Sequence, residues 1–203
     1  PDAVKDRPYF SDPAYHGFGA RWGMGVDGSE RRLCDYRCWP LLDEMSNWMA
    51  DKNVPLKRVL SISEVYGQAP GDDVYGASPV TYVRLDKLPT PDDVTPLIET
   101  LKTGYIFWSS GEVLIPSFEV QGGGRQAKIV ADVTWTFPLE FVEVMWGDGK
   151  TTGRQIIPAT HLAPLGAHRF EIAFDARGKK WVRFAAWDVA ANGASVQPTR
   201  LPR

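Results

Sequence analysis

Residues 126–136 read QAKIVADVTWT, and this stretch decides the fold. Two alternating sets of side chains run through it, Ile129, Ala131, Val133 and Trp135 in one set and Val130, Asp132 and Thr134 in the other. Successive side chains of a strand point to opposite faces of its sheet. The pattern therefore predicts a β-strand with one face turned toward a core.

Similar short runs lie on both sides of this strand. We expect strands near 105–109, 112–120, 126–136, 139–146, 153–157, 168–174, 180–189 and 194–198. Turn residues such as Gly122-Gly123-Gly124 and Asn192-Gly193 separate them. Many short strands at near-regular spacing are typical of an antiparallel sandwich or barrel. We expect residues 111–203 to form an antiparallel, immunoglobulin-like β-sandwich.

The first 110 residues have a different pattern. Residues 1–30 fit neither the helical nor the strand period, and we expect an irregular segment that docks on the rest of the chain. For residues 31–110 we expect a helix near 39–52, strands at 58–63 and 79–85, and a second helix capped by Thr90, with Pro91 first, ending at Gly104. The fold class is then α+β, mainly β, with a short α/β remnant of a β/α barrel before the sandwich.

Composition excludes several classes of protein. The 203 residues include 23 Lys and Arg against 25 Asp and Glu, and this balance argues against a nucleic-acid binder. No apolar run is long enough to cross a bilayer and no signal peptide opens the chain, so we expect a soluble protein, with a cytoplasmic location favoured. Two cysteines exclude a disulfide framework. Only three His, and a start at Pro1, predict a processed or partial polypeptide.

Acidic residues near the end of the predicted strand 58–63 are the candidate site. Glu64 closes this strand, Asp72 and Asp73 follow in the next loop, and His16 is the histidine placed to reach the same region. In βα units the loops after the strands carry the chemistry, so Glu64 would be a metal ligand or a proton-transfer group. The alternative is structural: Glu64 pairs with Arg58 or Arg84, and the two aspartates form Asx turns.

The tryptophans also have two interpretations. Trp135, Trp146, Trp181 and Trp187 occupy expected strand positions with apolar neighbours on the same face. The first interpretation places them in the sandwich core, and the second makes them a platform on which sugar rings stack.

Several strings together resemble the late part of PHP-domain metallohydrolases of the carbaryl-hydrolase-like type. They are LSISEVY at 60–66, PGDDVYG at 70–76, PVTYVRLD at 79–86, LKTG at 101–104, SGEVLIP at 110–116 and WVRFAAWD at 181–188. The likeness covers roughly residues 31–200. It implies a distorted β/α barrel whose His and carboxylate ligands hold two or three divalent metals, with a β-sandwich appended at its C-terminal end.

The resemblance implies a metal-dependent hydrolase that acts on a small carbamate, amide, ester or phosphoester through metal-bound hydroxide. Glu64 and Asp72 would be catalytic, and Asp73 and His16 would join them around Zn, Mn or Fe. The early H-x-H pair of the family has no counterpart here. We therefore expect an incomplete enzyme that needs a complementary N-terminal barrel chain or a homo-oligomer. The alternative is a non-catalytic β-sandwich module that binds a glycan or a partner protein.

Overall fold

The computed structural model describes residues 8, 11–20, 39–61, 79–190 and 192–202, and it is mainly β with antiparallel sheets. The smaller of the two antiparallel sheets has the order β5 (Val113–Gln121), β6 (Ala127–Trp135) and β9 (Gly166–Phe174). The larger has the order β3 (Val80–Val83), β4 (Ile106–Ser109), β11 (Gly193–Val196), β10 (Trp181–Asp188), β7 (Leu139–Gly147) and β8 (Thr152–Pro158). Strand β12 (Thr199–Arg200) also pairs with β10. Apart from β12, for which no strand was expected, these strands lie within two residues of the expected positions.

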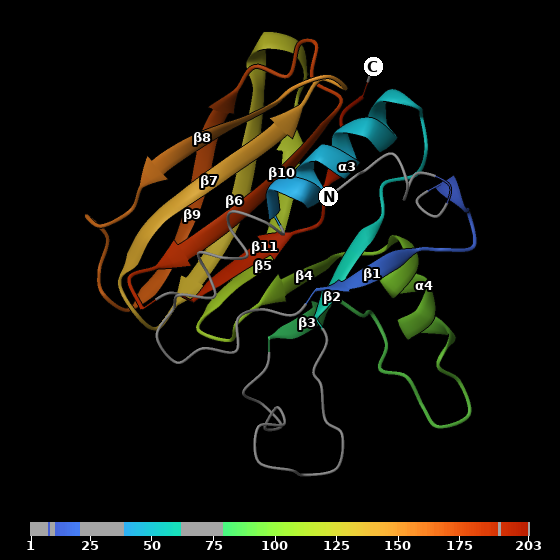
Figure 1. Ribbon diagram of the computed structural model, residues 1–203. Coiled ribbons are helices and arrows are strands. Elements are labelled where there is room, and N and C mark those ends of the chain that lie inside the picture. The colour runs from blue at the N-terminus through green and yellow to red at the C-terminus, as the bar shows by residue number, and fades with distance from the viewer. Residues whose placement is uncertain (1–7, 9–10, 21–38, 62–78, 191, 203) are drawn as a thin grey trace, which may run out of the picture.

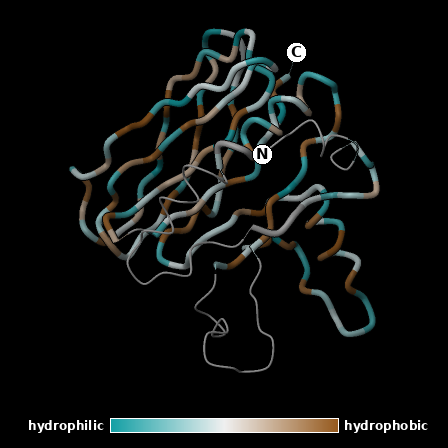
Figure 2. The backbone as a smooth tube through the Cα atoms, viewed as in Figure 1, coloured by the Kyte–Doolittle hydropathy of each residue, from teal (hydrophilic) through white to brown (hydrophobic). Residues whose placement is uncertain are grey.

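The main core lies between the two antiparallel sheets. Ile129, Ala131 and Val133 of β6 are buried in it, together with Val182 and Phe184 of β10. The side chains of Asp132 and Thr134 are more exposed, as the alternation in residues 126–136 predicts. The two sheets therefore pack in a sandwich-like arrangement around apolar side chains that alternate along each strand. Figure 2 shows these hydrophobic positions recurring along the strands.

A second apolar layer covers the other face of the large sheet. Helix α3 (Trp39–Asp51) contacts β7, β8 and β10, and Figure 1 shows it lying across them. The layer beneath it is built from buried residues of four elements, Trp39, Ala50, Trp108, Met145, Trp181, Ala185 and Trp187. Because side chains alternate along β10, Trp181 and Trp187 face this layer, while Val182 and Phe184 face the sandwich core. These two tryptophans thus lie under the helix and outside the sandwich interior.

Helix α3 also joins the two strands of a parallel pair. Strand β1 (Gly17–Ala20) pairs in parallel with β2 (Arg58–Ser61), and α3 lies between them in the sequence, which gives a β-α-β order. Gly17 is required for this contact, because a Cβ there would collide with the Arg58 carbonyl oxygen. The buried Lys57 ammonium donates to the Asp12 carbonyl at 2.6 Å, which holds residues 11–16 against the start of β2.

Two side chains form hydrogen bonds with the edge of β2 that does not pair with β1. The Gln197 amide accepts a hydrogen bond from the Val59 N–H at 2.7 Å and donates to the Val59 carbonyl at 2.9 Å. The Thr81 hydroxyl accepts from the Ser61 N–H at 2.8 Å. The other edge of β1 pairs with no strand in the described ranges, where β1 and β2 form a two-stranded sheet.

Strands β3 and β4 belong to the large sheet. Strand β4 pairs with β3 on one side and with β11 on the other. Strands β3 and β4 therefore share a sheet with β7, β8, β10 and β11, so this sheet takes strands from both sides of the expected boundary at 110. Within the described residues, β1 and β2 are the strands that lie outside the two antiparallel sheets.

The second helix begins later than the sequence predicted. Helix α4 spans Thr95–Thr103, and its residue before the first turn is Val94, which makes no side-chain cap. Thr90 and Asp93 instead bond to each other through their backbones in a tight turn, so the predicted start at Pro91 is wrong. Pro96 takes the place in the first turn that was expected for Pro91.

The first helix ends where it was expected to end. Asn53 adopts a positive φ of 58°, and the Val54 N–H bonds back to the Met49 carbonyl. A left-handed residue is a common way to end a helix. No helix in the described ranges has the length and hydropathy needed to cross a bilayer.

Candidate functional site

Three of the four predicted metal ligands lie outside the described residues. Glu64, Asp72 and Asp73 belong to residues 62–78, so the structure does not place them. His16 is described and exposed, directly before β1. Its carbonyl accepts a hydrogen bond from the Arg58 N–H at 3.0 Å.

The parallel pair separates the ends of the predicted site. Gly17 pairs with Arg58 at the amino end of the unit, and Ala20 pairs with Ser61 at its carboxyl end. His16 adjoins the amino end, whereas the sequence leading to Glu64 leaves from the carboxyl end. Polar groups that serve a βα unit gather at the carboxyl ends of its strands. His16 therefore adjoins the opposite end of the pair.

The two arginines offered as structural partners of Glu64 hold backbone carbonyls. Arg58 donates to the Gly104 carbonyl at 2.6 Å, and burial lowers the pKa of its guanidinium. Arg84 donates to the Pro116 carbonyl and lies 4.8 Å from the centre of the Tyr105 ring. Arg58 thus joins β2 to the end of α4, and Arg84 joins the segment after β3 to β5.

The described ranges bring together no group of three or more His, Cys, Asp or Glu side chains able to hold a metal ion. His161 and His168 lie in the sandwich and are exposed, and the ring of His168 packs edge-on against Phe170. The described residues alone therefore do not fit a metal centre, and no reaction step is derived through one.

The tryptophans that the structure describes are buried or half-buried. Trp135 is part of the sandwich core, and Trp181 and Trp187 lie under α3. Trp146 is half-buried, with the Phe174 ring edge-on and the Lys179 ammonium 5.1 Å from its ring centre. A sugar-stacking surface needs exposed rings, and the described tryptophans do not form one.

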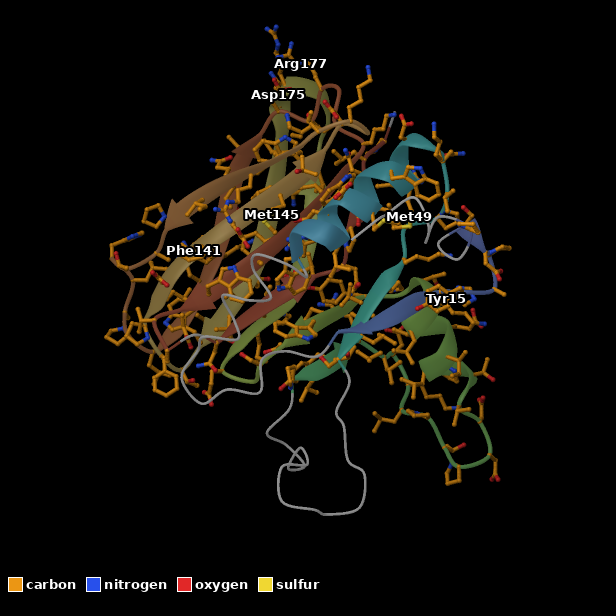
Figure 3. All side chains as sticks on the ribbon, in the orientation of Figure 1. Tyr15, Met49, Phe141, Met145, Asp175 and Arg177 are labelled. Atoms are coloured by element: carbon orange, nitrogen blue, oxygen red, sulfur yellow. The ribbon has the colours of Figure 1, made fainter. Side chains whose placement is uncertain are left out.

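A cluster of charged and aromatic side chains lies on the α3 side of the large sheet. We call it the outer-face cluster and define it as Trp39, Asp43, Glu143, Arg154, Arg183 and Trp187. Asp43 comes from α3, Glu143 from β7, Arg154 from β8, and Arg183 and Trp187 from β10. Figure 3 shows Met145 of β7 beside the amino end of α3, with Phe141 farther along the same strand.

Asp43 and Arg183 form a two-bond ion pair. The guanidinium donates to both carboxylate oxygens, at 2.7 and 2.8 Å. The side chains are 13% and 4% exposed. The Arg183 guanidinium carbon also lies 4.7 Å from the centre of the Trp39 ring. This geometry satisfies both charges and fixes the amino end of α3 on the sheet.

Glu143 is less completely paired. Its carboxylate is only 8% exposed, and one oxygen accepts a hydrogen bond from the Trp187 indole at 2.9 Å. The other oxygen lies 3.7 Å from the guanidinium of Arg154, whose side chain is 62% exposed. A buried carboxylate is costly unless charged or hydrogen-bonding groups surround it. This second oxygen can therefore accept a hydrogen bond from a further donor.

A cavity of about 330 Å³ opens at this cluster. Its lining residues are Trp39, Asp43, Glu143, Met145, Thr152, Gly153, Arg154 and Arg183. The volume is at the lower end of the range for small-molecule sites.

A larger hollow of about 560 Å³ lies where α4, β5 and residues 196–202 meet. Arg58 and Arg200 line it, and both bond backbone carbonyls, Arg200 those of Met49, Ala50 and Val54 at the end of α3. Burial raises the pKa of the Tyr105 hydroxyl, which donates to the Ile115 carbonyl at 2.7 Å. These groups hold neighbouring segments of the chain together.

The sequence analysis did not select the outer-face cluster. Its signal was present, since Glu143 is the one charge in the run 141–146 and Arg183 the one charge in the run 181–187. An apolar run of this kind indicates a strand that is covered on both faces. A charged side chain within it is then buried and needs a paired group. Which partner it has depends on α3, and the sequence pattern does not show where that helix lies.

Comparison with known proteins does not identify a family. No protein-family model matches the chain, and no curated protein or solved structure matches it. The functional argument therefore stands on the residues and their geometry.

Proposed function

We propose that the chain is part of a PHP-like, metal-dependent hydrolase that cleaves a small carbamate, amide, ester or phosphoester. In this proposal β1-α3-β2 is a remnant of a β/α barrel, and the later strands form an immunoglobulin-like domain appended to it. A divalent Zn, Mn or Fe ion would supply the acidified water of such a reaction.

The parallel β1-α3-β2 unit is the observation that supports this proposal best. Parallel strands need a crossover such as a helix, and they occur mostly in sheets of several strands that are covered on both faces. Here the pair has two strands, with β2 held by Gln197 and Thr81 and the far edge of β1 unpaired within the described residues. A further parallel strand of a complementary barrel chain would add at that edge.

The candidate site residues follow from the same unit. Glu64 comes three positions after Ser61, the last residue of β2, and Asp72 and Asp73 come after it. Carboxylates at the carboxyl end of a parallel strand suit the hard divalent ions. We assign Glu64 and Asp72 as catalytic candidates, with Asp73 as a further ligand. His16 adjoins the other end of the pair, so its role as a metal ligand must be tested by measuring metal affinity after its substitution.

The complementary part must supply the remaining ligands, and this sets the experiment. The chain alone and the chain joined to the sequence encoded before residue 1 are tested with Mn²⁺, Zn²⁺ and Fe²⁺. The substrates are 1-naphthyl methylcarbamate, p-nitrophenyl acetate and p-nitrophenyl phosphate. We expect metal-dependent hydrolysis and stoichiometric metal only in the joined protein. No metal and no hydrolysis in either form would overturn the proposal.

Replacing Glu64 tests its role directly. Glu64→Gln in the joined protein should lower metal affinity at least about tenfold, since even second-shell changes cost about 10–100-fold. Glu171→Gln, an exposed carboxylate on β9 paired with Lys128, is the matched control and should bind metal normally. Equal metal content in the two variants would remove Glu64 from the site.

A glycan-binding module is supported less well. That function needs exposed, coplanar aromatic rings, and the described tryptophans are covered by α3, by the sandwich or by Lys179. Docking of a partner protein is compatible with the unpaired edge of β1, and it is the alternative that the same experiment would favour if the joined protein binds no metal.

A further inference from the structure

The cavity at the outer-face cluster is built on one incompletely neutralised carboxylate. Glu143 is more than nine-tenths buried and lines the cavity. Among the described residues it accepts one hydrogen bond, from the neutral Trp187 indole. Its second oxygen has a cation only at 3.7 Å, on a side chain that extends largely into solvent. A charged donor within the cavity would complete its surroundings.

The charged side chains that line the cavity indicate the sign of the charge that a ligand there would carry. Asp43 and Arg183 neutralise each other through two hydrogen bonds. Glu143 contributes a second negative charge, which the exposed Arg154 offsets among the described residues that line the cavity. An anion in the place of the Arg154 guanidinium would lie beside the Glu143 carboxylate in a partly dry site, which costs free energy. A monocation that takes the place of Arg154 keeps the cavity neutral.

The remaining lining gives the shape of the ligand. Trp39 and Met145 supply an apolar wall, and Met side chains adapt to irregular partners. Thr152 and Gly153 form the rim on β8. A volume of about 330 Å³ suits a compact molecule of roughly one ring with a short arm.

We propose that this cavity binds a small organic monocation, a primary ammonium group on a compact apolar body. The ammonium displaces Arg154 and donates to the second oxygen of Glu143, while the apolar body packs against Trp39 and Met145. The proposal is independent of metal binding and hydrolysis, so either proposal can fail without the other.

Three ligands of similar shape test the charge requirement on the unaltered chain. Benzylammonium, benzyl alcohol and benzoate are titrated while the indole N–H resonance of Trp187 is followed by NMR. We expect saturable shifts with benzylammonium, binding at least tenfold weaker with benzyl alcohol, and none with benzoate. Equal affinity for benzyl alcohol, or tighter binding of benzoate, would overturn the proposal.

Two variants test the contact itself. Glu143→Gln keeps an acceptor for the Trp187 indole and removes the charge, so benzylammonium affinity should fall at least tenfold. Arg154→Met removes the competing cation and should raise the affinity severalfold. Glu171→Gln on β9 is the control and should leave it unchanged. Unaltered affinity in both cavity variants contradicts the proposal, and Arg154→Met decides alone if Glu143→Gln does not fold.

Discussion

Asp43 and Arg183 show how a single residue pair connects α3 to the sheet. Their two hydrogen bonds join positions 140 residues apart, and both side chains are largely buried. Removing one partner of such a pair leaves the other charge buried without compensation. The stability of the layer under α3 thus depends on an ion pair between residues that are far apart in the sequence.

Asp43→Ala should therefore destabilise the chain strongly. We expect a loss of about 3–5 kcal/mol in the free energy of unfolding, measured by urea denaturation. Glu44→Ala, an exposed neighbour on the same helix, should change it by less than about 0.5 kcal/mol. Similar midpoints for the two variants would show that the ion pair contributes little.

Asp148 controls the turn between β7 and β8, and its titration has a defined sign. The backbone N–H groups of Thr151 and Lys150 donate to its carboxylate and hold its pKa below the ordinary 3.8. Since the folded pKa lies below the unfolded one, this group stabilises the fold above about pH 4. That stabilisation is lost as the pH falls through the folded pKa.

Asp148→Asn should flatten this pH dependence, because the amide oxygen still accepts hydrogen bonds but does not titrate. Urea unfolding between about pH 5 and pH 2 should show a smaller decline in stability than in the unaltered chain. Asp86→Asn, in the exposed segment before α4, is the control and should reproduce the original decline. An unchanged slope in Asp148→Asn would contradict the assignment.

At the scale of elements, the edge of β2 is closed by one side chain. The Gln197 amide bonds both polar backbone groups of Val59, as a neighbouring strand would. This contact joins the parallel unit to the larger sheet. It also leaves β1 as the outer strand of the pair in the described residues.

Gln197→Met should loosen the parallel unit without melting the sandwich. We expect a cost of about 1–3 kcal/mol from the unsatisfied Val59 groups, measured by hydrogen exchange. Amides of residues 58–61 should exchange faster, while those of β6 stay protected. Gln155→Met on the exposed side of β8 is the matched control. Equal acceleration in β2 and β6 would mean that Gln197 supports the whole fold.

For the whole molecule, the unpaired edge of β1 should drive association. An exposed strand edge is a template for pairing with another chain, and a parallel pair is seldom left with two strands. Without a complementary barrel chain, we expect self-association at micromolar concentration in sedimentation equilibrium. Gly19→Pro removes a backbone donor from this strand and should shift the distribution to monomer, with circular dichroism confirming the fold. A monomeric unaltered chain would contradict this.

The strands were largely predictable, and the reason is local. Period-two patterning in residues 126–136 and its neighbours placed strands β2 to β11 within two residues of their observed bounds. Strands β1 and β12 were not predicted, and β1 lies in a stretch that was expected to be irregular. The helix at 39–52 followed from its apolar stripe. The start of α4 was wrong, because Thr90-Pro91-Asp92-Asp93 satisfies its own backbone in a turn before the helix begins. A good capping sequence and a good turn sequence use the same residues.

By itself, the sequence determined the period of each element and therefore which side chains alternate between two faces. Only the tertiary structure decided what each face meets: the sandwich core on one side of β10, and α3 with its tryptophans on the other. It also decided that Asp43 and Arg183 pair, and that Glu143 lines a cavity. The physical reason is distance along the chain. Alternation is a property of neighbouring residues, whereas the Asp43–Arg183 pair joins positions 140 residues apart and forms only when α3 packs on the sheet.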